Sequence, residues 1–133
     1  MENLEKVYNF LKEVHTFFFA SVEDGAARVR PFGFCAIVDG KLYFGMGKHK
    51  ASYRQAAENP NVEICSCRDR EWLRIRGKAV FDWNPETEKK IFAMAPFLEK
   101  MYGPESDLTF APFYLEDMEA EYANMQGAFE KWI

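Results

Sequence analysis

Apolar residues recur along this chain first with the period of a helix and then with the period of a strand. The opening segment, residues 2–14, is amphipathic with a helical repeat, which predicts a helix packed on a sheet. Its apolar positions are Leu4, Val7, Tyr8, Leu11 and Val14. A β-prone apolar run over residues 16–22 follows, and Glu23-Asp24-Gly25 after it is typical of a turn.

Most of the remaining chain has the pattern of short strands joined by tight turns. Asp39-Gly40 lies between apolar flanks and predicts a two-residue hairpin loop. Pro31 and Gly33 fall inside an otherwise strand-like run, which indicates an edge, a bulge or the close approach of a ligand. Gly77 indicates a further bulge. The strands predicted after residue 22 are 27–38, 41–46, 62–66, 71–83 and 113–124.

Three later segments have helical patterns, namely residues 51–58, 85–94 and 96–102. Asn59-Pro60 ends the first of them, because a residue that precedes proline avoids the α region. Asn84 can cap the second, with Pro85 in its first turn. Six strands joined mostly by tight turns predict a mainly β fold, in which an antiparallel sheet closes into a small barrel with peripheral helices. The 133 residues are expected to form a single domain, residues 1–133.

Composition and charge exclude several classes of function. The net charge of −4 gives no basic field for nucleic-acid binding. Three cysteines without a CxxC pair, and two histidines, argue against a disulfide framework and against a metal site. No stretch has the length and apolarity of a signal peptide or a membrane span, so we expect a cytoplasmic protein without membrane contact.

A glycine-flanked basic bend is the most informative stretch for chemistry. It consists of Gly45, Met46, Gly47, Lys48, His49, Lys50, Ala51, Ser52, Tyr53 and Arg54. Glycines let a backbone approach a ligand closely, and the cations lie at a predicted helix start, whose free N–H groups favour an anion. Ser52 adds a hydroxyl donor, so the bend suits a phosphate dianion. The alternative is a solvated lysine-rich loop.

Two strands carry arginines that are costly to bury without partners. Arg28 and Arg30 share one strand face next to Pro31 and Phe32. They could meet the carbonyl oxygens of a flavin pyrimidine ring, or they could face acidic residues across the sheet. Trp72, Arg74 and Arg76 also share a face, which could line a flat anionic ligand or form an exposed face of the barrel. The chain contains no GxSxG, HExxH or GxGxxG motif, and no catalytic residue can be assigned.

Taken in order, several runs of this chain resemble a known family. They are Thr16–Val22, Arg28–Gly33, Asp39–Phe44, Lys50–Gln55 leading to Asn59–Ile64, and Trp72–Val80. This set resembles the FMN-binding split-barrel proteins related to pyridoxamine 5′-phosphate oxidase, and most of all their short nitroimidazole-reductase-like (Nim-type) branch. The resemblance spans about residues 14–124.

The resemblance implies a homodimer that holds FMN between its subunits in a six-stranded split barrel. The strand Arg28–Phe32 would meet the edge of the isoalloxazine ring, and Gly45–Lys50 would follow the flavin and its ribityl chain. Lys48, Lys50 and Ser52 would meet the phosphate, and residues 125–132 of a second copy would cover the ring. Gly127–Ile133 lacks the Arg-x-His pattern of the vitamin B6 oxidases, so that activity is not expected.

The predicted function is therefore that of a flavin oxidoreductase, which passes electrons from reduced FMN to a small acceptor such as a nitroaromatic or a quinone. A non-enzymatic flavin-binding electron carrier or sensor is one alternative. A barrel that binds haem or a deazaflavin is another, and His15 or His49 would be its only histidine ligands.

Overall fold

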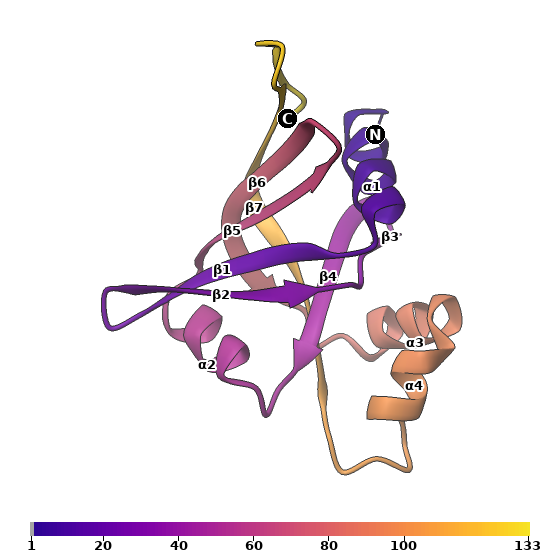
Figure 1. Ribbon diagram of the computed structural model, residues 1–133. Helices are drawn as coiled ribbons and strands as arrows, with labels where there is room; N and C mark the ends of the chain where they lie inside the picture. Colours follow the sequence, from indigo (N-terminus) through magenta and orange to yellow (C-terminus); the bar gives the residue numbers. More distant parts are fainter. Residues whose placement is uncertain (1) are drawn as a thin grey trace.

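The computed structural model describes residues 2–133 (Figure 1). Its elements in chain order are α1 (Glu2–Val14), β1 (Phe17–Glu23), β2 (Ala26–Phe32), β3 (Ala36–Val38), β4 (Lys41–Gly47), α2 (Ala51–Glu58), β5 (Asn61–Arg68), β6 (Glu71–Phe81), α3 (Pro85–Met94), α4 (Pro96–Tyr102), β7 (Phe110–Asn124) and β8 (Phe129–Lys131). The fold is mainly β with helices at the periphery, as the sequence predicts. None of the helices within residues 2–133 is long and apolar enough to cross a membrane.

The strands form one antiparallel sheet that curls into a split barrel. Its hydrogen-bonded order is β2-β1-β5-β6-β7-β4-β3, and β8 pairs with β7. The curl brings β1 across β4, where the rings of Phe17 and Phe44 lie 5.7 Å apart between centroids, and Figure 1 shows β1 and β2 crossing β4. No ladder within residues 2–133 joins β2 to β4, so the barrel stays open along this line.

The sheet has eight strands, whereas the sequence predicts six. The predicted strand 27–38 is divided, because β2 ends at Phe32 and pairing resumes at Ala36 in β3. Pro31 and Gly33 stand at this break, and proline cannot donate to a ladder. The additional strand β8 follows a turn in which the Asn124 side chain accepts hydrogen bonds from the backbone N–H groups of Gln126 and Ala128.

Other local signals are confirmed by the structure. Asp39 and Gly40 both adopt positive φ, 50° and 78°, as a two-residue hairpin loop between twisted strands requires. The register of β6 against β7 shifts between Arg76 and Lys78, which makes Gly77 the predicted bulge. The Asn84 side chain accepts a hydrogen bond from the backbone N–H of Glu86 and caps α3.

Aromatic rings fill the barrel interior. Phe17 and Phe19 are 0% exposed, whereas Phe18 between them is 47% exposed, which is the alternation of a strand with one buried face. The rings of Phe19 and Phe113 lie 5.5 Å apart and tie β1 to β7 across the interior. Each fully buried phenylalanine contributes roughly 1.5–3 kcal/mol by the area it removes from water.

A second apolar cluster places α3 and α4 against β3 and β4. It contains Ala36, Val38, Tyr43, Ile91, Phe92, Ala95, Leu98, Tyr102 and Phe110. Figure 1 shows the two helices next to each other, to the right of the half of β4 that leads toward α2. This packing brings α4 to the open line of the barrel, where the chain forms its candidate site.

Candidate functional site

A cleft of about 340 Å³ opens where β2 and β4 meet without pairing. Five segments line the cleft: β2 with the residues just after it, β4, the start of α2, α4 and the start of β7. In that order, the lining residues are Arg30, Pro31, Phe32, Gly33 and Phe34; Gly45, Met46 and Gly47; Lys50 and Ser52; Phe97, Leu98, Met101 and Tyr102; and Phe110. Its volume falls within the range of about 300–1,000 Å³ that is common for small-molecule sites.

Both charged side chains of the cleft lining, Arg30 and Lys50, are cationic, and none of the lining residues is acidic. The Arg30 guanidinium is held by uncharged groups: one terminal nitrogen donates to Ser21 Oγ (2.9 Å) and the other to Gln55 Oε1 (2.5 Å). It also lies 5.7 Å from the centroid of the Phe19 ring. An arginine positioned by neutral acceptors keeps its full positive charge available to a ligand.

A hydrogen-bond network fixes Arg30 in place. The buried Gln55 side chain accepts from Arg30 and from the Ser21 hydroxyl (2.6 Å), and its amide nitrogen donates to Glu23 (2.8 Å). Glu23 is also paired with Arg54 at 2.7 Å. These contacts connect β1, β2 and α2, so Arg30 is oriented before any ligand arrives.

The pKa values of this network follow from the same contacts. Burial, together with the nearby charge of Arg28, lowers the pKa of the Arg30 guanidinium, although arginine stays protonated in proteins. The hydrogen bond from Gln55, and then that from Arg54, lowers the pKa of the Glu23 carboxyl. Glu23 is therefore an anion at neutral pH, held on the α2 side of the network.

The basic bend supplies the second half of the polar side. The backbone N–H of Lys50 donates to the Gly47 carbonyl at 3.0 Å, which turns the chain into α2. Lys50 is the N-cap residue and its side chain makes no capping hydrogen bond. Ser52, 5% exposed, lines the cleft beside it. The free N–H groups at such a helix start attract an anion.

Lys48 and His49 of the same bend are not among the cleft-lining residues. The Lys48 ammonium lies 5.3 Å from the ring centroid of Trp83. His49 folds back over Gly47, so that a Cβ built on Gly47 would come within 2.5 Å of the imidazole Cε1. The residues predicted to bind the phosphate are therefore separated in the structure: Lys50 and Ser52 line the cleft, whereas Lys48 lies outside it.

The glycines of β4 make room for protein rings. A Cβ on Gly45 would come within 2.1 Å of the Phe110 ring, and a Cβ on Gly47 within 3.0 Å of the Tyr102 hydroxyl oxygen. The sequence predicts that these glycines let a ligand approach the backbone. In the structure they also let Phe110 and Tyr102 pack against the strand and form the cleft wall.

The α4 wall was missed by the sequence argument. Phe97 and Met101 are one helical turn apart and remain 57% and 49% exposed, although both are apolar and line the cleft. Phe34 lines the cleft from the segment after β2. The signal that could have identified this wall is the i, i+4 apolar pair in a helix that already buries Leu98 and Tyr102.

Trp72, Arg74 and Arg28 are the remaining predicted site residues, and they do not line the cleft. Leu73 and Ile75 are 0% exposed in the barrel interior, so Trp72 and Arg74 lie on the outer face of β6, where Arg74 pairs with Glu63 at 2.7 Å. Arg28 is exposed on β2, with one nitrogen near the carbonyl oxygen of Ala27.

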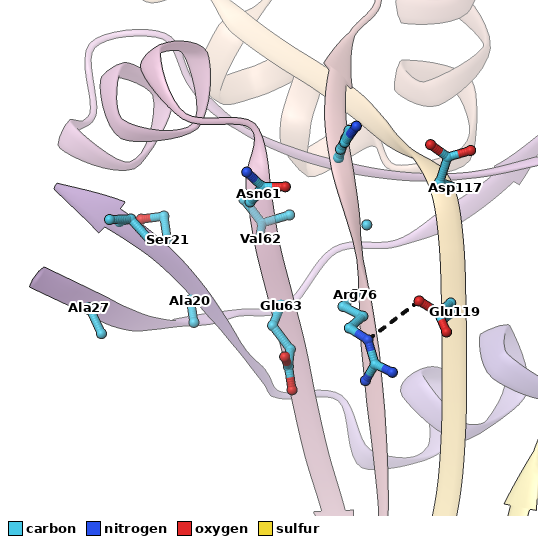
Figure 2. Close-up of a pocket in the computed structure, with 12 residues that line it drawn as sticks. Ala20, Ser21, Ala27, Asn61, Val62, Glu63, Arg76, Asp117 and Glu119 are labelled. Carbon is cyan, nitrogen blue, oxygen red and sulfur yellow. Dashed lines mark ion pairs between the residues drawn. The ribbon is translucent and has the colours of Figure 1, made fainter. Parts of the chain in front are cut away.

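The same outer face carries a larger hollow, an outer groove of about 460 Å³ across β1, β5, β6 and β7 (Figure 2). Figure 2 shows Arg76 turned toward Glu119, with Glu63 on the adjacent strand. The Arg76 Nε lies 3.5 Å from a carboxylate oxygen of Glu119. Arg76 also pairs with Glu121 at 2.5 Å. The groove lining has two cations, Arg76 and Lys78, and three acidic residues, Glu63, Asp117 and Glu119, so it has no excess of positive charge.

The fold and the cleft define a split-barrel protein with a cationic cofactor-sized cleft at the open line of its sheet. The model of the pyridoxamine 5′-phosphate oxidase family matches residues 4–127, so the chain belongs to this family. A crystal structure of a NimC/NimA family protein from Clostridium acetobutylicum has a TM-score of 0.90 and 30% identity, covering 98% of this chain and 91% of that one. This places the chain in the Nim-like branch.

Two more distant structures share the fold. One is a pyridoxamine 5′-phosphate oxidase-related, FMN-binding protein from Nostoc punctiforme, with a TM-score of 0.67 and 16% identity over 98% of this chain and 85% of that one. The other is a haem-binding protein from Mycobacterium smegmatis, with a TM-score of 0.67 and 15% identity over 89% of this chain and 52% of that one. No curated protein sequence matches the chain.

Proposed function

We propose that this chain binds FMN in the cleft between β2, β4 and α4, and that it acts as an oxidoreductase toward a small acceptor of the nitroaromatic or quinone type. The observation that carries the proposal is the charge of the cleft: its lining has two cations and no acidic side chain. Membership of the pyridoxamine 5′-phosphate oxidase family and the fold shared with an FMN-binding protein from Nostoc punctiforme support it.

The residues present fit FMN. Lys50, Ser52 and the first N–H groups of α2 would hold the phosphate, since a helix start with a cation is a ready anion site. Arg30 would donate to the pyrimidine edge of the ring, where reduction develops negative charge. Pro31, Phe32 and Met46, with the β4 glycines, would line the remaining path of the cofactor.

FMN supplies hydride and single-electron transfer when it is bound. The contribution of the chain is binding, orientation and electrostatics. Arg30, fixed by Ser21 and Gln55, holds a positive charge at one end of the cleft without having to reorganise. Phe97 and Met101 present apolar surface on the other side of the cleft.

We further propose that two copies form the functional unit. The outer face of the sheet exposes Phe18 and Val29 at 47% and 68%, and β8 exposes Phe129 at 64%. Such apolar side chains on one sheet face are typical of a protein contact surface. In this arrangement Trp72 and Arg74, which do not reach the cleft of their own chain, would contact the cofactor bound to the second copy.

The proposal is tested by titrating the apo-protein with FMN while following the flavin absorbance and fluorescence. We expect saturable binding at micromolar FMN or below. No binding in that range would overturn the proposal. A Soret band in the purified protein, or binding of a deazaflavin in preference to FMN, would assign the cleft to another cofactor.

Turnover separates an enzyme from an electron carrier. With FMN bound, oxidation of NADH or NADPH in the presence of a nitroaromatic or a quinone supports the oxidoreductase. Flavin binding without turnover for any pair of donor and acceptor supports the electron carrier. The chain has no GxGxxG motif, the fingerprint of dinucleotide binding, which is consistent with a carrier that does not bind NADH or NADPH itself.

A further inference from the structure

The α4 wall of the cleft has a chemistry of its own. Phe97 and Met101 present apolar surface to the cleft while being about half exposed, with Phe34 contributing from the segment after β2. Arg30 and Lys50, the cations proposed for FMN, belong to β2 and to the start of α2, so the α4 side of the lining is free of charge. An uncharged wall of this kind favours contact with an aromatic ring over contact with an ion.

A single polar group interrupts this apolar wall. The Tyr102 hydroxyl oxygen lies 3.0 Å from the position that a Cβ on Gly47 would take, which places it beside β4 at the cleft. Tyr102 is 9% exposed. Burial is the one cause that raises the pKa of its hydroxyl, and no hydrogen bond or charge from the described residues contributes. The hydroxyl therefore stays protonated at neutral pH, and within residues 2–133 it donates to no protein acceptor.

Within residues 2–133 no buried side-chain polar atom lacks a hydrogen-bond partner, so the unpaired Tyr102 hydroxyl is open to the cleft. It can therefore donate to a ligand that enters the cleft. Its position beside an aromatic and thioether wall limits the class of ligand. The ligand has to be flat and uncharged, to lie against Phe97 and Met101, and it has to carry an oxygen that accepts a hydrogen bond.

We infer that the α4 side of the cleft is the acceptor subsite, which takes an uncharged planar molecule with a carbonyl or nitro oxygen hydrogen-bonded to Tyr102. Phe97 and Met101 set the preference for an aromatic ring, and Tyr102 sets the preference for the oxygen. This inference rests on the proposed function, since it adds the second reactant to a cleft whose polar side holds FMN.

The test measures equilibrium binding of three probes to the FMN-loaded protein by calorimetry. The probes are 1,4-naphthoquinone, naphthalene, which lacks the oxygen atoms, and 1,4-naphthoquinone-2-sulfonate, which adds a charge. We expect the quinone to bind more tightly than naphthalene, and at least about tenfold more tightly than the sulfonate, because an unpaired charge against an apolar wall is unfavourable.

Variants then divide the two roles. Tyr102→Phe removes the hydroxyl alone. It should lower the affinity for the quinone by about threefold to tenfold, as the loss of one hydrogen bond implies, and leave the affinity for naphthalene unchanged. Phe97→Ala should weaken both molecules by a similar factor. Met94→Ala is the control, because Met94 is 57% exposed on the neighbouring α3 and does not line the cleft.

The affinity for FMN, measured on the same variants, separates this inference from the proposed function. Failure of the parent protein to bind FMN overturns both. If FMN binds normally and neither Tyr102→Phe nor Phe97→Ala changes the affinity for the quinone, only the acceptor subsite is overturned. A loss of FMN affinity in these variants, with unchanged quinone binding, also overturns it, because α4 would then be a wall for the cofactor.

Discussion

The cleft at the open line of the barrel and the outer groove in Figure 2 differ in charge more than in size. The groove is the larger of the two, about 460 Å³ against about 340 Å³. In the groove Arg76 is paired with Glu119 and Glu121. In the cleft Arg30 is held by Ser21 and Gln55, which are neutral, and Lys50 has no acidic neighbour in the lining. Unbalanced cations, and not the volume of a hollow, therefore mark the site for an anionic cofactor.

The largest effect on FMN affinity is expected when a cation is removed from the cleft. Lys50→Ala should weaken FMN binding by about tenfold to a hundredfold, since a hydrogen bond to a charged group contributes roughly 1.5–3 kcal/mol. Lys48→Ala should have a smaller effect, because the Lys48 ammonium lies over Trp83 outside the cleft lining. Fluorescence titration of FMN measures both.

The matched control lies in the groove. Arg76→Ala also removes one positive charge, but from a residue whose partners are acidic. If Arg76→Ala weakens FMN binding as much as Lys50→Ala does, net charge and not the cleft governs FMN binding, and the contrast between cleft and groove fails.

The next largest effect is expected on stability, from a packing change where Gly45 meets Phe110 in the cleft wall. Gly45→Ala would push a methyl group to within 2.1 Å of the Phe110 ring, which is 1% exposed and cannot move freely. Overpacking of this kind costs about 1–3 kcal/mol of unfolding free energy. Urea denaturation measures it.

Gly33→Ala is the companion variant. Gly33 also lines the cleft, but a Cβ there would meet its nearest neighbour, the His15 carbonyl oxygen, at an ordinary 3.6 Å. Its unfolding free energy should stay close to that of the parent. Equal destabilisation by the two alanines would mean that Phe110 adapts and that Gly45 is not required for packing.

The part of the fold that sequence predicts well is local. Asp39-Gly40, Gly77 and Asn84-Pro85 act within a few residues, and each forms the turn, bulge or cap that its chemistry requires. The division of strand 27–38 and the addition of β8 depend on which partner strand each segment finds. That information is distributed over the whole sheet, so the pattern predicts six strands instead of eight.

The same limit applies to the candidate site. Residue type correctly indicated that Trp72 and Arg74 share a face, but periodicity cannot say whether that face is inside or outside the barrel. The α4 wall escaped notice because its role arises from the packing of Leu98 and Tyr102 against β4, a contact between segments far apart in sequence. Lys50, Ser52 and Arg30 are predicted from local chemistry, and all three line the cleft.

The hydrogen-bond network behind Arg30 should give the protein a modest dependence of stability on pH. The folded-state pKa of Glu23 is lowered by Gln55 and Arg54, so its stabilising effect is present above its usual value of 4.5 and is lost as pH falls through the lower folded value. Glu23→Gln should flatten the loss of stability over that acidic range. Thermal unfolding across the range measures it, and an unchanged pH profile would show that Glu23 does not support the network.

The smallest effect is expected in the groove. Arg76→Ala breaks two partly exposed ion pairs, and such pairs contribute about 0–1 kcal/mol each. Its urea midpoint should lie near that of the parent. A loss of stability as large as that of Gly45→Ala would indicate that the groove is a structural centre and not a solvated face.

The most direct measurement compares FMN with riboflavin, which lacks the phosphate, in the parent protein and in Lys50→Ala. The account predicts that the parent binds FMN at least about tenfold more tightly than riboflavin, which is roughly the effect of one charge-assisted hydrogen bond, and that most of this preference disappears in the variant. Equal affinity for the two flavins in the parent, or a preference that survives in Lys50→Ala, would contradict the assignment of the phosphate to the cationic cleft.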